Sequence, residues 1–304
     1  MGGGIAVTGA SGFVGRHLVR AASSGGREVR GLVRSASAEE AVARAGGRPV
    51  RGLEHDAALA RALEGSRALV HLAQIGTERG GESYDAVNVG LTGRVLEAAR
   101  RAGVPRVVAF SGLGVARYGM SRRCTNRYFL SKLAAEVLLL RSDLEAIVFR
   151  PSYIVGHGNG LVAALLDAME RGQVERPGDG AYRLQPIAVS DAVAAVLAAV
   201  DRPPGAFPLV FDLVGPQAVS YTAFLDRLAS AARATGRSAE LRVREVAVAE
   251  AERLAREGGF QGMGPDELDC LLCDEVSDAA PLVALLGRAL VPLDEALTSA
   301  VRPA

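Results

Sequence analysis

The sequence has little cysteine, almost no net charge and no long apolar run. Its 35 Lys and Arg residues nearly balance its 34 Asp and Glu residues, which removes the electrostatic basis for nonspecific binding to nucleic acid or to an anionic membrane. No apolar stretch approaches the roughly 20 residues that cross a bilayer. The chain runs into Ile5-Ala6-Val7 without a basic leader. We therefore expect a cytoplasmic protein with no membrane span and no nucleic-acid partner.

The three cysteines, Cys124, Cys270 and Cys273, are too few for a disulfide framework and fit a reducing compartment. The spacing Cys270-x-x-Cys273 suggests a redox or metal motif. It lies, however, within a helical pattern over residues 266–273 that has no second ligand pair nearby. We expect two thiols that face the core, and no metal site.

A glycine-rich turn follows the first apolar run. Residues 8–15 read Thr-Gly-Ala-Ser-Gly-Phe-Val-Gly and lead into a helical pattern. A helix N-terminus offers unpaired N–H groups and the positive end of the backbone dipole, and glycine lets a phosphate approach the backbone. The spacing is G-x-x-G-x-x-G, so the strand before it and the helix after it carry the argument. We interpret the turn as a diphosphate site; a packing turn without ligand is the alternative.

Short apolar runs alternate with helical patterns through the first half of the chain. Strands are predicted at residues 28–33, 68–73, 106–111 and 146–149, and helices at 86–102 and 161–171. The alternation predicts an α/β fold with a doubly wound parallel (Rossmann) sheet. After Arg150-Pro151 the alternation is lost. We expect a dinucleotide-binding domain over residues 1–150 and a smaller C-terminal α/β substrate lobe over residues 151–304, partly interleaved with the Rossmann sheet.

Tyr128 and Lys132 lie four residues apart in a helical pattern, so they share one face of the helix. A free tyrosine has a pKa of about 10, and a neighbouring ammonium favours the phenolate. Such a tyrosine can give or take the proton that accompanies hydride movement at a carbonyl or alcohol carbon. The pattern is short, and only the glycine turn upstream favours this interpretation over an ordinary amphipathic helix.

These segments resemble the short-chain dehydrogenase/reductases, in the extended and atypical branch. That branch includes epimerase/dehydratase-like proteins and the relatives of an accessory subunit of respiratory complex I. The resemblance covers nearly the whole chain and includes residues 70–73, 88–92, 108–112, 150–156 and 185–191. It implies a cofactor diphosphate on Gly9, Gly12, Phe13, Val14 and Gly15, and a catalytic pair of Tyr128 and Lys132. It further implies that Lys132 binds the nicotinamide ribose, that Ala73 lies beside the cofactor, and that Pro151 lies near the nicotinamide.

The end of the second strand indicates which dinucleotide is preferred. An NAD site needs a carboxylate there for the ribose hydroxyls, whereas a 2′-phosphate needs a cation. This strand ends Leu32-Val33-Arg34-Ser35, without Asp or Glu. Arg34 can clamp a phosphate, with Ser35 or Ser37 adding a hydroxyl. We expect NADP(H) in preference to NAD(H); a solvated surface arginine is the alternative.

Two positions depart from the family pattern. Gly52 stands where an acidic residue often contacts the adenine, and Leu113 aligns with the serine that polarises the substrate carbonyl. Ser111 is the remaining serine candidate on this strand, two residues before that position. Loss of one such donor typically slows an enzyme by about 100-fold to 1,000-fold. The arginine-bearing segment 116–126 is expected to form a loop near the pocket.

Three functions are compatible with these residues. The leading one is an NADP(H)-dependent oxidoreductase acting on a small-molecule substrate, with Tyr128, Lys132 and Ser111 as catalytic residues. The second is a nucleotide-sugar type epimerase or dehydratase that uses the same groups. The third is a structural, assembly or sensor protein that holds a dinucleotide without turnover, a function that Leu113 favours. The substrate and the reaction direction are not indicated, and a homo-oligomer stays open.

Overall fold

The structure, a computed structural model, describes residues 4–203, 205–237, 240–257 and 259–302. The chain forms two units, each assembled from three segments. The first comprises Met1–Val115, Tyr128–Arg150 and Ala192–Phe211. The second comprises Ala116–Arg127, Pro151–Asp191 and Asp212–Ala304.

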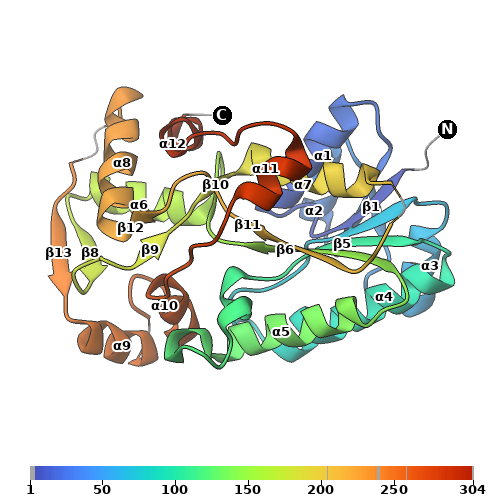
Figure 1. Cartoon of the computed structure of the whole chain (residues 1–304), viewed down its shortest axis with the longest axis horizontal. Coiled ribbons are helices and arrows are strands. Elements are labelled where there is room, and N and C mark those ends of the chain that lie inside the picture. The colour runs from blue at the N-terminus through green and yellow to red at the C-terminus, as the bar shows by residue number, and fades with distance from the viewer. Residues whose placement is uncertain (1–3, 204, 238–239, 258, 303–304) are drawn as a thin grey trace. The chain divides into compact units, whose positions relative to one another are not determined.

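The first unit is built on a seven-stranded sheet with the order β11-β6-β5-β4-β1-β2-β3 (Figure 1). The strands are β1 Ile5–Thr8, β2 Val29–Val33, β3 Arg48–Arg51, β4 Ala68–His71, β5 Arg106–Phe110, β6 Glu145–Pro151 and β11 Leu209–Leu213. Parallel pairing runs from β1 outward to β2 and β3, and from β1 through β4 and β5 to β6. The order reverses at β1, so the carboxyl ends of β1 and β4 border the crevice where doubly wound sheets bind ligands.

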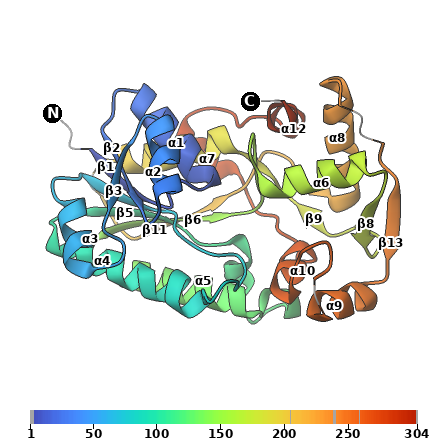
Figure 2. The same ribbon diagram turned by 180° about the vertical axis from the view of Figure 1, so that it is seen from behind.

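Helices cover both faces of this sheet. Figures 1 and 2 show α1, α2 and α7 over one face and α3, α4 and α5 over the other. Their bounds are α1 Phe13–Ser24, α2 Ala36–Arg44, α3 Asp56–Leu63, α4 Leu91–Arg101, α5 Arg127–Leu140 and α7 Val189–Asp201. Every residue of β1 and β4 is buried, as expected for strands covered on both sides. The predicted doubly wound α/β fold is confirmed.

The predicted elements lie where the capping residues placed them, within a few positions. The helix expected at residues 86–102 is α4, preceded by a wider helical turn over Asp85–Gly90. It ends just before Gly103, whose φ of +68° suits glycine far better than other residues. The helix expected at residues 161–171 is α6 Gly160–Glu170.

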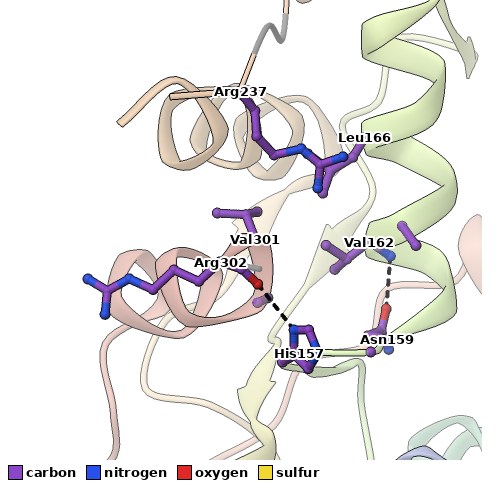
Figure 3. A pocket seen from close by; sticks show the side chains of 10 residues that line it. His157, Asn159, Val162, Leu166, Arg237, Val301 and Arg302 are labelled. Carbon is purple, nitrogen blue, oxygen red and sulfur yellow. Dashed lines mark hydrogen bonds between the residues drawn. The ribbon is translucent and has the colours of Figure 1, made fainter. Parts of the chain in front are cut away.

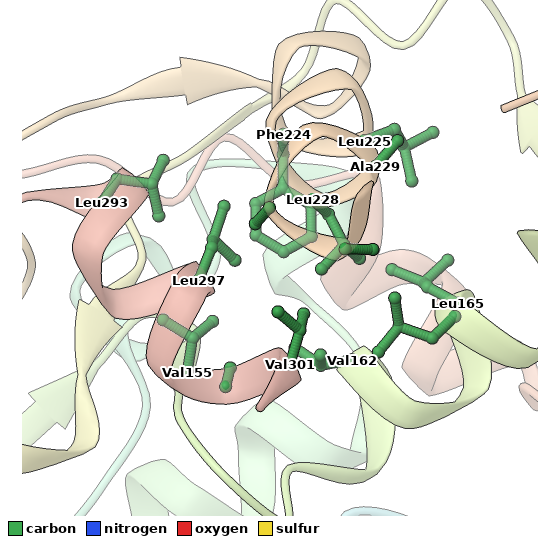
Figure 4. Packing of buried hydrophobic residues seen from close by; sticks show 14 of the residues in the cluster. Val155, Val162, Leu165, Phe224, Leu225, Leu228, Ala229, Leu293, Leu297 and Val301 are labelled. Carbon is green, nitrogen blue, oxygen red and sulfur yellow. The ribbon is translucent and has the colours of Figure 1, made fainter. Parts of the chain in front are cut away.

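Three helices enclose the core of the second unit. They are α6, α8 Tyr221–Ala234 and α12 Leu293–Val301. Figure 4 shows their apolar side chains pointing toward one another, with Leu165, Phe224 and Leu297 among them. Burying a side chain of this size contributes about 1.5–3 kcal/mol. This cluster therefore gives the second unit an apolar core of its own.

Short strands and helices complete the second unit. The strand pairs are β7 Ile154–Val155 with β10 Ile187–Ala188, β9 Arg183–Leu184 with β12 Val219–Ser220, and β8 Val174–Pro177 with β13 Val243–Val246. The remaining helices are α9 Val248–Glu257, α10 Pro265–Leu271 and α11 Ala280–Leu286. No helix among the described residues is long and apolar enough to cross a bilayer.

Candidate functional site

The glycine turn is shaped by contacts that only glycine allows. Gly9 has a φ of +66°, and a Cβ there would lie 2.7 Å from the Ala73 nitrogen at the end of β4. A Cβ on Gly15 would lie 2.1 Å from the Gly9 carbonyl oxygen. The turn is closed by a 3.0 Å hydrogen bond from the Gly12 N–H to the Gly9 oxygen. These close approaches bring α1 directly against the end of β1.

The N-terminus of α1 is available to an anion. Gly12 is its N-cap residue, and no side chain caps the helix among the residues described. The first N–H groups of a helix have no partner within the helix, and they carry the positive end of its dipole. Phe13, Val14 and Gly15 supply these groups. This end of α1 therefore suits a diphosphate.

A cavity of about 550 Å³ in the first unit opens beside this turn. That volume falls in the range of cofactor sites, about 300–1,000 Å³. Its lining includes four of the predicted cofactor residues, Gly9, Gly12, Arg34 and Ala73. Pro151 ends β6 and opens a segment of the second unit.

Arg34 already has an acidic partner in the structure. Its Nη1 lies 2.8 Å from Oε1 of Glu82, and the two side chains are 62% and 39% exposed. Ser35 caps α2 by accepting the Ala38 N–H, and its Oγ lies 3.1 Å from Oγ of Ser37. The acidic partner of Arg34 thus lies 48 positions further along the chain. Nothing in the sequence near Arg34 signals this pairing.

Arg94 is a second residue that no sequence motif indicates. It lines the cavity together with Leu53, next to Gly52, where the family acid is lacking. Its Nε donates to Asp56 at 2.7 Å and its Nη2 to the Leu53 carbonyl at 2.8 Å. The guanidinium is therefore held from both sides at the wall of the cavity.

Lys132 lies against the end of β5. Its ammonium donates a 2.8 Å hydrogen bond to the Phe110 carbonyl and another to Gln74. Burial lowers the pKa of Lys132 to about 7, and the nearby Glu136 opposes that change. Lys132 is also the only lysine in the sequence. The sequence alone therefore distinguishes Lys132 from the other basic residues, which are all arginine or histidine.

Tyr128 reaches the same end of β5 from the preceding turn of α5. A Cβ placed on Gly112 would lie 3.9 Å from the Tyr128 hydroxyl oxygen. The ring meets Tyr84 edge-on, with 5.9 Å between centroids. The predicted pair on α5 therefore converges on the segment that follows β5.

Ser111 directly follows β5, and its side chain is buried. Its N–H donates to the Phe149 carbonyl at 2.7 Å, whereas its Oγ has no hydrogen-bond partner among the described residues. A buried hydroxyl without a partner is uncommon and costs stability. Leu113, at the aligned serine position, is 5% exposed. Of these two positions, only Ser111 offers a hydroxyl, and that hydroxyl is unpaired among the described residues.

His71, at the end of β4, has both ring nitrogens bonded within the fold. Its Nδ1 lies 2.7 Å from Oγ1 of Thr8, and its Nε2 lies 3.0 Å from Oγ1 of Thr92. Burial, followed by the charge of Lys132, lowers the pKa of His71 to about 3. The ring is therefore neutral and ties β1, β4 and α4 together.

Segment 116–127 belongs to the second unit, where its arginines are occupied. Arg123 bonds to Glu252 at 2.7 Å and to Asp269 at 2.6 Å. Arg117 donates to the Asp274 carbonyl and, at 3.0 Å, to the Val276 carbonyl. These arginines hold the segment to other parts of the unit.

A separate cavity of about 360 Å³ lies in the second unit and contains none of the predicted site residues (Figure 3). Its polar groups make local structural contacts: Asn159 caps α6, and His157 Nδ1 lies 3.2 Å from the Arg302 carbonyl. Arg237 bonds to Glu170 at 2.7 Å. The cavity wall is otherwise mainly apolar and carries no catalytic constellation.

Two curated proteins similar to this chain are named as reductases. A ceramide reductase of Caulobacter vibrioides is 32% identical over 203 residues, which are 64% of this chain and 60% of that protein. A 4-hydroxy-2-methyl-3-oxo-4-farnesyl-3,4-dihydroquinoline-1-oxide ketoreductase of Stigmatella aurantiaca is 30% identical over 216 residues, which are 66% of this chain and 65% of that protein. The aligned part thus spans less than two thirds of either relative.

Solved structures match over almost the full length. MoeE5 in complex with UDP-glucuronic acid and NAD is 25% identical, with a TM-score of 0.72 over 98% of both chains. A UDP-glucuronic acid 4-epimerase from Bacillus cereus is 18% identical and shares the fold, with a TM-score of 0.73 over 98% of this chain and 97% of its own. The model of the NAD dependent epimerase/dehydratase family matches residues 5–208. This chain therefore belongs to that family, within the extended branch of the short-chain dehydrogenase/reductases that its motifs predict.

Proposed function

We propose that this protein is an NADP(H)-preferring oxidoreductase that moves hydride to or from a carbonyl or alcohol carbon of a small molecule. The observation that carries the proposal is the convergence of Tyr128 and Lys132 on the end of β5. The names of the curated relatives support a reductase.

The residues present fit a dinucleotide. The close approaches at Gly9 and Gly15 and the uncapped start of α1 make a cradle for the diphosphate. Arg34, with the hydroxyls of Ser35 and Ser37, is our candidate for the 2′-phosphate subsite. We assign Ala73 and Pro151 to the nicotinamide end of the cofactor, as the family resemblance implies.

The proposed chemistry divides between the cofactor and the side chains. When bound, the nicotinamide supplies or accepts the hydride. Tyr128 gives its phenolic proton to the substrate oxygen during reduction and takes it back during oxidation. The Lys132 ammonium stabilises the phenolate that remains and holds the nicotinamide ribose. Ser111 donates its unpaired hydroxyl to the substrate oxygen.

Two alternatives each rest on one observation. MoeE5, solved with a UDP-sugar and NAD, matches 98% of this chain and favours an epimerase or dehydratase that acts on a nucleotide sugar. Leu113 in place of the aligned serine favours a protein that holds a dinucleotide without turnover. The second alternative predicts dinucleotide binding without activity, and the first predicts activity on UDP-sugars without net consumption of cofactor.

Cofactor preference is tested by titrating the purified protein with NADPH and with NADH. Arg34→Ala is compared with Arg44→Ala, which removes the same charge from the last residue of α2, the helix that begins two residues after Arg34. Loss of a charge-assisted phosphate contact at an exposed side chain weakens NADPH binding about tenfold and leaves NADH binding unchanged. Equal affinities for the two cofactors in the wild type would show the preference to be wrong.

Catalysis is tested with NADPH and a panel of aldehydes, ketones and quinones, and with UDP-sugars in parallel. Tyr128→Phe is expected to lower turnover about 100-fold to 10,000-fold, because it removes the proton-transfer group. Tyr118→Phe, at a half-exposed tyrosine of segment 116–127, is the matched control. Unchanged turnover in Tyr128→Phe would refute the proton-transfer role.

A further inference from the structure

Two cysteines that are distant in the sequence lie in contact within the second unit. Sγ of Cys124 is 2.7 Å from Sγ of Cys273, and both residues are buried. A disulfide bond measures about 2.05 Å. Even the smaller carbon atoms make their best non-bonded contacts at about 3.5–4.0 Å. The two sulfur atoms are thus closer than non-bonded neighbours normally lie, and a small side-chain adjustment brings them to bonding distance.

The backbone around both cysteines is held in place. Arg123, directly before Cys124, bonds to Glu252 at 2.7 Å and to Asp269 at 2.6 Å. Asp274, directly after Cys273, accepts a hydrogen bond from Arg117 through its carbonyl oxygen. Ion pairs and hydrogen bonds therefore fix both sides of the contact, so the sulfurs meet within an ordered interface.

We propose that Cys124 and Cys273 form an oxidation site, at which a disulfide cross-links segment 116–127 to the chain that follows α10. The oxidant is a low-molecular-weight disulfide such as oxidised glutathione. The thiolate of one cysteine attacks a sulfur of the oxidant, forms a mixed disulfide and releases one small thiol. The second cysteine then attacks the mixed disulfide and releases the other. Two protein S–H bonds and one S–S bond of the oxidant are lost, one protein S–S bond forms, and the two small thiols carry away the electrons and protons.

The surroundings of the pair set the conditions for the reaction. Burial raises the pKa of the Cys273 thiol, so little thiolate is present at neutral pH. Attack by Cys273 is therefore slow near neutrality and faster in alkaline buffer, and the burial of both residues further limits access of the oxidant.

Cys270 offers an internal control. It lies on α10, is half-buried, and its thiol pKa is also raised by burial. It precedes Cys273 by three positions, but the sulfur in contact with Cys124 is that of Cys273. A reaction driven only by proximity in the sequence would join Cys270 to Cys273, whereas the structure assigns the bond to Cys124 and Cys273.

The cross-link would restrain segment 116–127, which directly precedes Tyr128 of the proposed catalytic pair. Segment 116–127 runs directly into α5, whose second residue is Tyr128. A bond at Cys124 anchors the chain four positions before that tyrosine. The cross-link itself does not depend on the proposed function, because it forms whether or not the protein turns over a substrate.

The experiment uses the full-length protein under native conditions. Wild type, Cys124→Ser, Cys273→Ser and Cys270→Ser are incubated with oxidised glutathione or with dithiothreitol. Each sample is then quenched in acid, unfolded, alkylated and examined by intact mass and by non-reduced peptide mapping. Circular dichroism confirms that each sample is folded before quenching.

In the wild type, oxidation is expected to remove two of the three alkylatable thiols and to yield a linked peptide pair containing Cys124 and Cys273. Cys270→Ser gives the same link, and neither Cys124→Ser nor Cys273→Ser gives an intramolecular link between 124 and 273. The wild-type peptide map decides the question even where a variant does not fold. Three alkylated thiols after native oxidation, or a link that includes Cys270, would overturn the proposal.

Discussion

The ammonium of Lys132 donates a 2.8 Å hydrogen bond to the carbonyl oxygen of Phe110, the last residue of β5. This bond joins α5 to the sheet at the strand end next to Ser111. It also holds a cation in a buried position, where burial lowers its pKa to about 7. Lys132 of the proposed catalytic pair is therefore anchored by the fold before any ligand binds.

Lys132→Met is expected to stabilise the fold in mild acid. The folded-state pKa of Lys132, about 7, lies below its ordinary value of 10.5. Below pH 7 the amine is charged in both states, and the folded state carries the cost of burying that charge. Between these values the unfolded chain binds more protons, so wild-type stability rises with pH. Lys132→Met is thus expected to raise the free energy of unfolding by about 1–4 kcal/mol in mild acid. The gain becomes smaller as the pH rises toward 10.5, the ordinary pKa of lysine.

Urea unfolding of both proteins at about pH 6 and about pH 10 measures this difference. Lys132→Arg is the control, because its guanidinium keeps its charge across the whole range. It is expected to be no more stable than the wild type at either pH. A gain from Lys132→Met that does not change with pH would contradict the assigned pKa.

Ser111→Ala is expected to raise stability and to lower turnover. Its Oγ is buried without a partner among the described residues, so removing it relieves a desolvation cost of about 1 kcal/mol. If Ser111 polarises the substrate, turnover falls about 100-fold. Thermal unfolding and steady-state kinetics on the same preparation test both effects. A gain in stability with unchanged turnover would remove Ser111 from the catalytic set.

Gly15→Ala is expected to distort the glycine turn. The new Cβ would lie 2.1 Å from the Gly9 oxygen, so the backbone must move, at a cost of about 1–3 kcal/mol. Dinucleotide binding should be lost with it. Gly93→Ala in α4 is the matched control, because its nearest neighbour is 4.0 Å away. That variant should gain about 0.5–1 kcal/mol, and equal losses in the two variants would refute the steric argument.

Glu82→Gln is expected to strengthen NADPH binding. If Arg34 binds the 2′-phosphate as proposed, Glu82 competes with that phosphate for Arg34 and repels it by charge. Because the pair is largely exposed, the gain is limited to about 0.2–1 kcal/mol, or at most about fivefold. Glu40→Gln, an exposed carboxylate on α2, controls for the change in net charge. NADH affinity should stay the same, and a parallel gain for NADH would show that no phosphate is involved.

Local patterns were sufficient for the sheet, for the glycine turn and for the spacing of Tyr128 and Lys132. Each depends on neighbours within one turn or one strand, where periodicity and capping carry the signal. The Rossmann order followed because parallel strands need crossover helices. The helix expected over residues 266–273 ends at Leu271, so Cys273 lies outside it.

Long-range pairings were not predictable from the sequence. Arg34 meets Glu82 across 48 positions, and Cys124 meets Cys273 across 149. No periodicity links residues so far apart, and their proximity is set by packing of the whole unit. In the sequence Arg122 and Arg123 look like arginines of a solvated loop for the same reason, because their acidic partners lie more than a hundred positions away.

The single lysine gives this protein one lysine amine for selective chemical labelling. A chain with 35 Lys and Arg residues uses arginine everywhere except at position 132, where it carries a compact amine whose pKa burial can lower. Reagents that acylate amines therefore have one lysine target in this sequence, and they reach its buried amine only when the surrounding structure opens locally. Near neutral pH that side chain is partly unprotonated and nucleophilic. Covalent labelling at a single point, and its suppression by a bound ligand, can report on this site without any knowledge of the substrate.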